Sequence, residues 1–375
     1  MTTFRDHVRG GLPRGTRQPA KTDPGPTRSA LPQSSIREVA KRAGVSVGTV
    51  SNVLNRPDLV AEATRDRVRA AIDELGFVRN ESARRLRTGP DGPDEPEASE
   101  GRRSPRARAF GVIVEDLANP YATDVARGAE LTLNAAGYEA FWLTTDHSPD
   151  KERRLLELLE DQRATGVVVI PVCLKADGIA RLRAAGMSVV LLDRAGDQVC
   201  SAQVDHMVGG DIAAAHLLEL GRDDMVFVTG RPEPQPCLER RDGAARTLAK
   251  AGGGELVTLT QEALTVGEGR AAAHRVLALS PVPTGVFCAN DLLAVGLVNE
   301  LIRLGVRVPE DIAVIGYDDI ELAAGAAVPL TTIRQPRREL GMEAAELALA
   351  ETAEGARHEH RQIILAPELV IRESA

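Results

Sequence analysis

The chain of 375 residues contains few aromatic side chains, because Phe, Trp and Tyr together make up only 3%. Hydrophobic residues still make up 43%, so small aliphatic side chains must fill most of the interior. No stretch approaches the ~20 consecutive apolar residues of a membrane span, and the N-terminus lacks the apolar core and cleavage site of a secretory signal. We therefore expect a cytoplasmic protein that is long enough for two or three domains.

Motifs for catalysis and metal binding are also missing. The sequence contains no G-x-x-x-x-G-K-[ST] and no H-E-x-x-H, and Gly267-Glu268-Gly269 lacks the rest of a dinucleotide fingerprint. The seven histidines form no ligand pattern, and His358 and His360 are expected to be solvated in a charged loop. The cysteines lack C-x-x-C spacing and indicate reduced, mostly buried thiols. We expect no enzymatic activity, no cofactor and no metal site. The cysteines are Cys173, Cys200, Cys237 and Cys288.

Positive charge is concentrated near the N-terminus. Residues 1–90 contain 17 Lys and Arg against 9 Asp and Glu, a net of +8, whereas the whole chain carries −8. A basic head on an acidic body is the electrostatic pattern of a DNA-binding module. Residues 1–33 are rich in Pro, Gly, Arg and Thr without periodicity, which predicts a disordered basic arm. That arm could contact phosphates or be a plain leader.

Residues 34–78 have the pattern of a helix-turn-helix. Ser35 and Glu38 have the spacing of a capping box, which starts a first helix. Gly44 is suited to end that helix in the left-handed conformation. Ser46 can then cap a second helix.

The spacing of small and apolar residues supports the same interpretation. Ala40 is small where two helices must cross closely, Gly44 makes the turn, and Val50 seals the pair. A third helix is expected at about residues 64–75. The pattern by itself would also fit a three-helix packing module with no nucleic-acid role, and the charge distribution favours DNA binding.

A series of short motifs runs through this region and continues past it. These are Val39-Ala40, Ala43-Gly44-Val45-Ser46, Thr49-Val50-Ser51, Val53-Leu54-Asn55, Thr64-Arg65, Arg67-Val68, Leu75-Gly76-Phe77, Asn80 and Ala83-Arg84-Arg85-Leu86. In this order and spacing, without gaps, the stretch resembles the lactose/galactose repressor (LacI/GalR) family of bacterial transcriptional regulators.

The resemblance implies two modes of DNA contact. The second helix would enter the major groove, and a hinge helix at 79–87 would enter the minor groove, where Leu86 would pry open the central base step. Leu86 could instead pack on the core, but its arginine neighbours argue against burial. The residues that the resemblance places at DNA are Ser46, Val47, Gly48, Thr49, Ser51, Asn52, Asn55, Thr64, Asn80, Ala83, Arg84 and Leu86.

The sequence departs from the family pattern at several positions. Asn52 stands where arginine is commoner, and because asparagine can pair with adenine, we expect an operator that differs at the corresponding base. Ala61 replaces a capping serine before the third helix, and Arg79 replaces a proline before the hinge. The flexible linker at 88–108 is unusually long, which puts tight control of the hinge by the core in doubt.

From residue 109 the chain alternates short apolar runs with amphipathic helical patterns, as parallel α/β sheets do. The length of 109–375 predicts two doubly wound lobes with a ligand in the cleft between them. We expect lobe 1 at about 109–204 plus 335–360 and lobe 2 at about 205–334 plus 361–375. The strand candidates are 110–114, 139–144, 166–170, 188–192, 225–228, 285–289 and 312–316, and the helix candidates include 151–164, 209–220 and 291–304.

The motifs of this segment are Asn119-Pro120-Tyr121, Arg127-Gly128, Leu192-Asp193-Arg194, Val204-Asp205, Glu239-Arg240, Asp242-Gly243, Asn290-Asp291, Gly316-Tyr317-Asp318-Asp319 and Pro329-Leu330-Thr331-Thr332-Ile333. With them the segment resembles the periplasmic-binding-protein-like core of the same family. The resemblance implies that an effector contacts Tyr121, Asp193, Arg240, Asn290 and Asp318.

These effector contacts have alternatives that the sequence leaves open. Asn290-Asp291 and Asp318-Asp319 could simply cap helices. Leu264 stands where sugar-responsive relatives often carry a stacking aromatic, so a sugar is one candidate effector among small molecules.

Together these features predict a DNA-binding transcriptional regulator, a repressor by expectation, that is bacterial and associated with the nucleoid when bound to DNA. It would bind a near-palindromic operator as a homodimer and be released or tightened by the effector. The alternative is a solute-binding protein of a transport system without DNA function. Such a protein would share the core fold but need an export signal and no DNA-reading domain.

Overall fold

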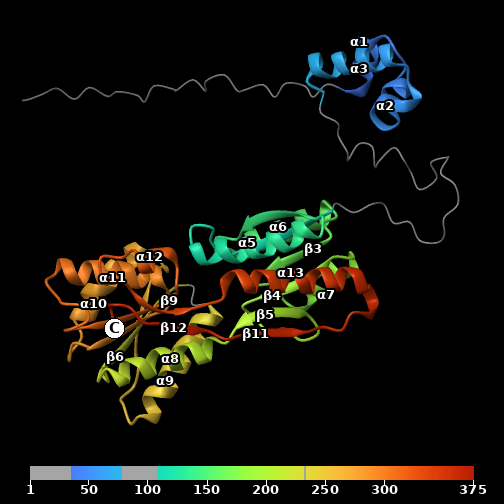
Figure 1. Ribbon diagram of the computed structural model, residues 1–375. Coiled ribbons are helices and arrows are strands. Elements are labelled where there is room, and N and C mark those ends of the chain that lie inside the picture. Colours follow the sequence, from blue (N-terminus) through green and yellow to red (C-terminus); the bar gives the residue numbers. More distant parts are fainter. Residues whose placement is uncertain (1–34, 78–107, 232–233) are drawn as a thin grey trace, which may run out of the picture. The chain divides into compact units, whose positions relative to one another are not determined.

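The computed structural model describes residues 35–77, 108–231 and 234–375 (Figure 1). They belong to an N-terminal unit that ends at Glu100 and a second unit from Gly101 to Ala375. None of the helices in the described part is long and apolar enough to cross a membrane. The predicted arm, the hinge helix and the linker up to residue 107 lie outside the described residues. The same holds for the predicted DNA contacts Asn80, Ala83, Arg84 and Leu86.

The N-terminal unit contains the predicted helix-turn-helix. Its elements are α1 (Ile36–Ala43), α2 (Val47–Asn55), the 3-10 helix η1 (Pro57–Leu59) and α3 (Glu62–Leu75). The capping box is present, since the Ser35 side chain accepts the Glu38 backbone N–H and the Glu38 carboxylate accepts that of Ser35. Gly44 ends α1 with φ 64°, and Ser46 caps α2 by accepting the Thr49 N–H at 3.0 Å. Local hydrogen bonds therefore define the turn.

One fully buried valine from each helix forms the centre of this bundle. They are Val39, Val50 and Val68. The third helix begins two residues earlier than predicted, and its N-cap residue, Ala61, makes no side-chain hydrogen bond. The start of α3 therefore lacks the stabilisation that a serine or aspartate would supply.

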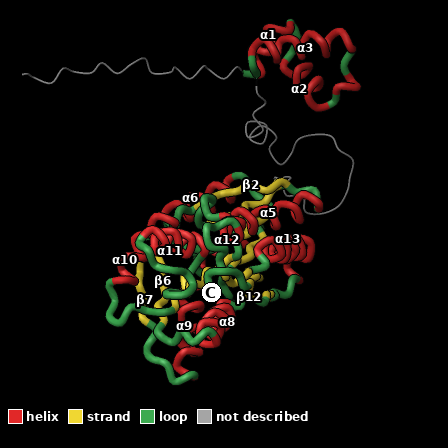
Figure 2. The backbone as a smooth tube through the Cα atoms, turned by 60° about the vertical axis from the view of Figure 1, so that its left-hand side comes forward, coloured by secondary structure: helices red, strands yellow, loops and turns green. Residues whose placement is uncertain are grey.

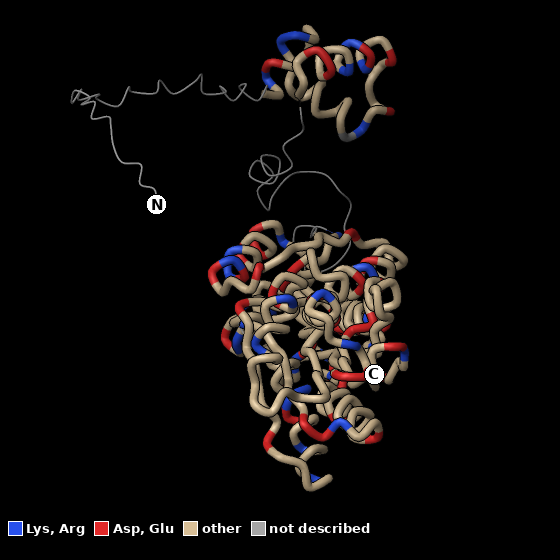
Figure 3. The backbone as a smooth tube through the Cα atoms, turned by 90° about the vertical axis from the view of Figure 1, so that its left-hand side faces the viewer, with Lys and Arg blue, Asp and Glu red and all other residues tan. Residues whose placement is uncertain are grey.

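The folded bundle is less basic than the first ninety residues as a whole. Between residues 35 and 77, seven Lys and Arg stand against six Asp and Glu. Figure 3 shows both signs distributed over the three helices. The positive surplus of the first ninety residues therefore lies in 1–34 and 78–90.

Two sheets form the second unit (Figure 2). The first has the order β11-β5-β4-β3-β1-β2 with all neighbours parallel, and the second has the order β12-β10-β9-β8-β6-β7 with only β12 antiparallel. These are doubly wound sheets, which confirms the predicted fold class. The strands are β1 (Ala109–Val114), β2 (Glu139–Thr144), β3 (Gly166–Val169), β4 (Ser188–Leu192), β5 (Cys200–Val204), β6 (Met225–Gly230), β7 (Val257–Gln261), β8 (Gly285–Cys288), β9 (Ala313–Asp318), β10 (Thr331–Arg334), β11 (Gln362–Leu365) and β12 (Glu368–Val370).

Helices cover both faces of each sheet. They are α5 (Pro120–Ala135), α6 (Pro149–Asp161), α7 (Ala176–Ala184), α8 (His206–Glu219), α9 (Gln235–Lys250), α10 (Val266–Leu277), α11 (Asp291–Arg303), α12 (Glu321–Ala324), α13 (Arg337–Glu354) and the 3-10 helix η2 (Gly355–Arg357). In lobe 1, α5 and α13 share one buried cluster, whereas α6 and α7 contribute to another. In lobe 2, α8 and α9 lie on one side of the sheet, and α10 and α11 on the other (Figure 1).

The chain crosses between the lobes three times: after β5, before α13, and between β11 and β12. The last crossing lies later than predicted. Residues 361–375 were expected in lobe 2, but β11 pairs in parallel with β5 of lobe 1, with Gln362 opposite Ser201. Only β12 and the residues after it belong with lobe 2. The four-residue edge strand β11 pairs with a strand about 160 residues earlier in the chain. A local sequence pattern cannot predict such a pairing.

Paired glycines allow α8 and α9 to cross in direct contact. A Cβ on Gly210 would lie 2.0 Å from the Arg240 carbonyl oxygen, and a Cβ on Gly243 would lie 2.1 Å from that of Met207. Only residues without a side chain permit this approach. The crossing brings His206, at the start of α8, beside Arg240 of α9, with 3.3 Å between Arg240 Nε and His206 Nδ1. Backbone packing therefore positions a candidate effector residue.

Candidate DNA-reading surface and effector site

The second helix of the bundle presents its first turns at the surface. Gly48 and Asn52 are exposed, whereas Val47, Thr49 and Ser51 are partly buried. The hydroxyl groups of Ser46 and Thr49 lie 2.9 Å apart, so the cap also orients a predicted DNA contact. Asn52 lies one helical turn after Gly48, so the two share a face. An exposed polar face at a helix N-terminus is the geometry that reads base edges in helix-turn-helix proteins.

The other predicted DNA contacts of this unit lie on separate elements. Thr64 lies in the first turn of α3 and is partly buried. Asn55 is the last residue of α2. Their roles, like those of the α2 residues, remain predictions.

A pocket of about 120 Å³ opens between the two lobes at the carboxyl ends of the strands. Lobe 1 contributes residues that follow β1 and β3, and lobe 2 contributes residues that follow β6 and β7. Ligands of parallel α/β sheets bind at this edge. The lining residues are Glu115, Asp116, Asn119, Tyr121, Ala122, His147, Ile170, Arg231, Ala263, Leu264 and Thr265.

Of the five predicted effector contacts, Tyr121 alone lines this pocket. Glu115, Asp116 and Arg231 were missed by sequence reasoning, although a signal exists. Glu115 and Arg231 follow directly on an apolar strand, and Asp116 comes one residue later, since β1 ends at Val114 and β6 at Gly230. Polar residues at that position of a parallel strand are candidates for ligand contact.

Behind the pocket, buried side chains form a polar network that joins the lobes. The Tyr121 hydroxyl of α5 donates to the carboxylate of Asp193, which follows β4. Asp193 Oδ1 lies 3.5 Å from His206 Nε2 on α8 of lobe 2. His206 Nδ1 lies 3.1 Å from the Tyr317 hydroxyl oxygen. The network therefore brings together two of the predicted effector contacts, Tyr121 and Asp193, and adds His206, which the sequence analysis did not name.

Arg240 is the cation of this network and is only 6% exposed. Its guanidinium carbon lies 3.7 Å above the centre of the Tyr317 ring, a cation–π contact. Its Nη1 donates to the Ala289 carbonyl oxygen at 2.6 Å. Several N–H groups of the Arg240 guanidinium are therefore already bound to other protein groups.

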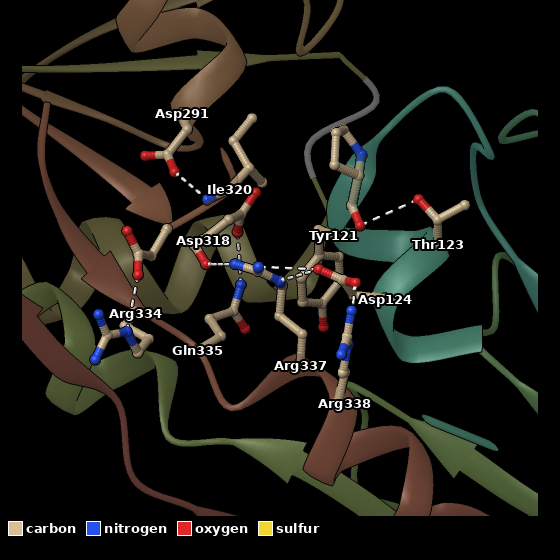
Figure 4. A network of polar contacts seen from close by, with 12 residues as sticks. Tyr121, Thr123, Asp124, Asp291, Asp318, Ile320, Arg334, Gln335, Arg337 and Arg338 are labelled. Carbon is tan, nitrogen blue, oxygen red and sulfur yellow. Dashed lines mark hydrogen bonds and ion pairs between the residues drawn. The ribbon is translucent and has the colours of Figure 1, made fainter. Parts of the chain in front are cut away.

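Asp318 ends β9 in an unusual backbone conformation, with φ 113°. Its carboxylate accepts from Gln335 Nε2 at 2.6 Å, and its carbonyl oxygen accepts from Arg337. Arg337 also pairs with Asp124 of α5 at 2.9 Å, as Figure 4 shows. Arg337 thus connects the end of a lobe 2 strand to a lobe 1 helix. A non-glycine residue held at such a φ is typical of functional sites.

Several groups of the site titrate away from their ordinary values. Burial, together with the charge of Asp193, raises the pKa of Glu115 to about 7. Burial raises the pKa of Asp318 to about 6, against the opposing effect of Arg240. Burial and the charge of Arg240 lower the pKa of His206, so its imidazole is neutral at pH 7. The charge of the site therefore changes near neutral pH.

Three buried polar atoms of the site make no hydrogen bond to the described residues. Asp193 Oδ1 and His206 Nε2 face each other at 3.5 Å without a formed hydrogen bond, and Gln335 Oε1 is the third. Unpaired buried polar atoms are costly and few in folded proteins. All three lie in the network that joins the lobes.

The remaining predicted contact, Asn290, has the capping role that the sequence also allowed, while its contact with an effector stays a prediction. Its Oδ1 accepts the Leu293 N–H at 3.0 Å and caps α11, and its Nδ2 donates to the carbonyl oxygen of Leu264, a lining residue. Asn290 is therefore a helix cap that supports the pocket wall. Asp318 and Asp319 are not caps, because the N-cap residue of α12 is Ile320 and makes no side-chain hydrogen bond.

The expectation that His358 and His360 are solvated is wrong for His358, whereas His360 is exposed. The His358 side chain is 1% exposed, and its Nε2 lies 3.1 Å from Cys200 Sγ. His360 Nδ1 lies 3.7 Å from the same sulfur. Within the described ranges these three are the residues grouped closely enough to hold a metal ion. They meet because β11 returns to lobe 1 beside β5.

Comparison with known families divides the chain in the same way. Residues 35–80 match the model "Bacterial regulatory proteins, lacI family". Residues 214–375 match a periplasmic binding protein-like domain. The first match covers the helix-turn-helix and the second covers most of lobe 2 and the return to lobe 1.

Individual relatives extend over nearly the whole chain. The chain is 33% identical over 349 residues to the HTH-type transcriptional repressor PurR of Photobacterium profundum, covering 91% of this chain and 98% of that protein. The structure of the transcriptional regulator CelR–cellobiose complex is 28% identical with a TM-score of 0.65, covering 91% and 100% of the two chains. A LacI family regulator from Enterococcus faecium with bound ribose is 27% identical with a TM-score of 0.66, covering 71% and 98%.

Proposed function

The chain belongs to the lacI family of bacterial DNA-binding transcriptional regulators, and on this premise we propose that it represses transcription as a homodimer on a near-palindromic operator. We propose further that a small polar molecule, bound between the lobes, changes its affinity for that operator. The observation that carries the proposal is the presence, in one chain, of an exposed α2 face and a polar pocket at the junction of two lobes. The transport alternative is set aside, because the relatives are repressors.

In the DNA-bound state, α2 would lie in the major groove with Gly48 and Asn52 nearest the bases. The absent side chain at Gly48 lets the helix approach the base edges closely, and Asn52 can pair with adenine through N6 and N7. Because the folded bundle carries almost no net charge, Arg84, Arg85 and the N-terminal arm would supply much of the phosphate contact.

The DNA proposal is tested by selecting binding sites from a randomised duplex library with the purified full-length chain. We expect a two-fold-symmetric sequence, bound with a steep salt dependence. Leu86→Ala should weaken binding most at operators with a flexible central step, since an intercalating wedge works only where bases unstack readily. Leu59→Ala, at an exposed leucine of η1, is the matched control. Enrichment of a sequence without symmetry would contradict the dimer, and equal effects of the two variants would contradict the wedge.

The pocket indicates the chemistry of the effector. Glu115 and Asp116 are acceptors for hydroxyl groups. Asn119 of lobe 1 and Arg231 of lobe 2 can supply donors. Tyr121 is the aromatic residue among the lining residues, and its hydroxyl is bound to Asp193. This set suits a small polyhydroxylated molecule such as a sugar more than a flat apolar ring.

The network behind the pocket could couple ligand binding to DNA affinity, because it joins the two lobes. Arg337 and the Asp193–His206 contact both join lobe 1 to lobe 2. A ligand that pairs with Asp193 Oδ1 or His206 Nε2 would change the bonds between lobes and favour one lobe angle over another. Such a ligand shifts the equilibrium only by its difference in affinity between the two arrangements, typically about 1 to 3 kcal/mol.

The effector proposal is tested by thermal shift of the full-length chain against a panel of pentoses, hexoses and polyols. A compound that stabilises the protein is then titrated against Asp116→Asn and Arg231→Ala. We expect each variant to weaken binding about tenfold or more, because each removes a charged hydrogen bond. Asp150→Asn, at an exposed residue of α6, should leave the affinity unchanged. If a stabilising compound binds the pocket variants as well as the unmodified chain, the proposed site is wrong.

A further inference from the structure

A second cluster of chemically active side chains lies in lobe 1, away from the pocket. Cys200 begins β5, and His358 and His360 lie in the segment that joins η2 to β11. Because β5 and β11 are adjacent parallel strands, the start of one and the approach to the other meet at the same edge of the sheet. The effector pocket lies at the opposite, carboxyl-terminal edge.

The spacing of the three donor atoms suits a tetrahedral ion. Cys200 Sγ lies 3.1 Å from His358 Nε2 and 3.7 Å from His360 Nδ1, and all three atoms lie within 4.8 Å of one another. Zinc bonds of ordinary length at a tetrahedral angle place a sulfur and a nitrogen ligand about 3.5 Å apart. Shifts of a few tenths of an ångström would therefore bring these atoms around one ion.

The surroundings of the cluster orient its donors. His358 Nδ1 lies 2.7 Å from Glu354 Oε2, so the carboxylate holds the proton on Nδ1 and leaves the lone pair of Nε2 facing the sulfur. The Arg361 backbone N–H donates to Cys200 Sγ at 3.4 Å, a contact that stabilises a thiolate. A carboxylate that fixes the tautomer of a ligating histidine is a regular part of zinc sites.

One neighbour opposes a cation. Arg183 Nη2 lies 3.2 Å from His360 Nδ1 and must release that lone pair when an ion binds. Arg183 keeps two other partners, Glu351 at 2.9 Å and the Gln198 carbonyl oxygen at 2.5 Å, so it has bonds to retain after the release. Its charge lowers the affinity of the site but does not block it.

We propose that Cys200, His358 and His360 form a binding site for Zn²⁺ or a similar borderline-soft divalent ion, with water as the fourth ligand. On binding, the ion bonds to Cys200 Sγ, His358 Nε2 and His360 Nδ1, and the thiol proton leaves to solvent. The ion links the start of β5 to the segment entering β11, which continues into the third crossing between the lobes. A bound ion therefore stabilises lobe 1 at one of the three connections to lobe 2.

The test uses the full-length chain without an affinity tag, stripped of metal with a chelator and titrated with Co²⁺ and then Zn²⁺. We expect one Co²⁺ per chain, a near-ultraviolet charge-transfer band from the thiolate, and the intense visible bands of a tetrahedral ion. Zn²⁺ should displace Co²⁺ and bleach those bands. Zn²⁺ should also raise the midpoint of thermal unfolding, because it binds the folded state.

Variants separate the site from adventitious binding. Cys200→Ser should abolish the charge-transfer band, and Glu354→Gln should weaken binding about 10- to 100-fold, as loss of a supporting carboxylate does. His360→Gln, at an exposed residue, keeps the test valid if Cys200→Ser fails to fold. Cys173→Ser and His274→Gln lie outside the cluster and should change nothing. A Co²⁺ spectrum without the thiolate band, or equal affinity in the His360→Gln variant, would overturn the proposal.

Discussion

The helical bundle and the two-lobed core differ in the exposure of their candidate functional residues. On α2, Gly48 and Asn52 are exposed. In the core, Asp193, His206 and Arg240 are buried. His206 contacts Arg240 within lobe 2 and lies 3.5 Å from Asp193 of lobe 1. Under the proposed function, DNA would dock on groups that are already exposed to solvent, whereas an effector would bind beside groups that already contact one another between the lobes.

This difference has a physical origin in size and shape. A duplex offers a long surface, so a small bundle with one exposed helix face is sufficient to contact it. A small molecule offers few contacts and must be surrounded to be bound tightly, which requires a pocket between packed elements. The cost is a set of buried polar atoms, such as Gln335 Oε1, that lack hydrogen-bond partners among the described residues.

The largest expected effect concerns the closely packed core. Gly243→Ala places a methyl group 2.1 Å from the Met207 carbonyl oxygen, so α8 and α9 must separate. We expect a loss of about 3 kcal/mol or more in the free energy of unfolding of the core, measured by denaturant unfolding followed by circular dichroism. Gly254→Ala is the control, since nothing lies within 4 Å of a Cβ there. Similar losses in both variants would show that the crossing is not closely packed.

Substitutions on the exposed face of α2 should leave the stability of the bundle unchanged and alter only its DNA sequence preference. Asn52→Arg is expected to shift the preferred base at one operator position from adenine to guanine, by about 1 to 3 kcal/mol of discrimination. The measurement is fluorescence anisotropy with paired operators at one fixed salt concentration. Thermal unfolding of the variant should match the unmodified chain. An unchanged base preference would remove Asn52 from the residues that read DNA.

Buried charge in the core should make its stability depend on pH. The folded-state pKa of Glu115 is raised from 4.5 to about 7, so the folded state holds this proton more tightly than the unfolded state does. The associated stability is complete below pH 4.5 and is lost as the pH rises through 7. Since the side chain is partly exposed, we expect a loss of about 1 to 2 kcal/mol between pH 5 and 8. Glu115→Gln should remove this loss in urea unfolding, and an equal slope in both proteins would contradict the assignment.

The smallest expected effect repairs a weak position in the bundle. Ala61 makes no side-chain hydrogen bond at the start of α3, so Ala61→Ser should stabilise the bundle by about 0.5 to 1 kcal/mol. Urea unfolding of the full-length chain, followed by signals of the N-terminal unit, measures the change. Ala70→Ser, at an exposed position within the same helix, is the control and should be slightly destabilising. Equal effects of the two substitutions would exclude a capping role.

The bundle could be predicted almost completely because its determinants are local. Ser35 and Glu38 are three residues apart, and Gly44 and Ser46 act within one turn of their own positions. The strongly apolar strands of the core were predicted for the same reason. Five strands escaped prediction, and they are short or rich in polar residues, such as β7 with its Val-Thr-Leu-Thr-Gln sequence.

The amino-acid sequence by itself determined the helix-turn-helix, the alternation of strands and helices, and the candidates at strand ends, because each depends on neighbours a few residues away. The tertiary structure alone decided which of these candidates meet. Tyr121 reaches Asp193 across 72 residues, and Cys200 meets His358 across 158. It also assigned Asn290 to a cap, moved β11 into lobe 1 and buried His358. Such contacts follow from strand order and from three crossings between lobes, which are properties of the whole chain and leave no periodic trace in any short stretch of it.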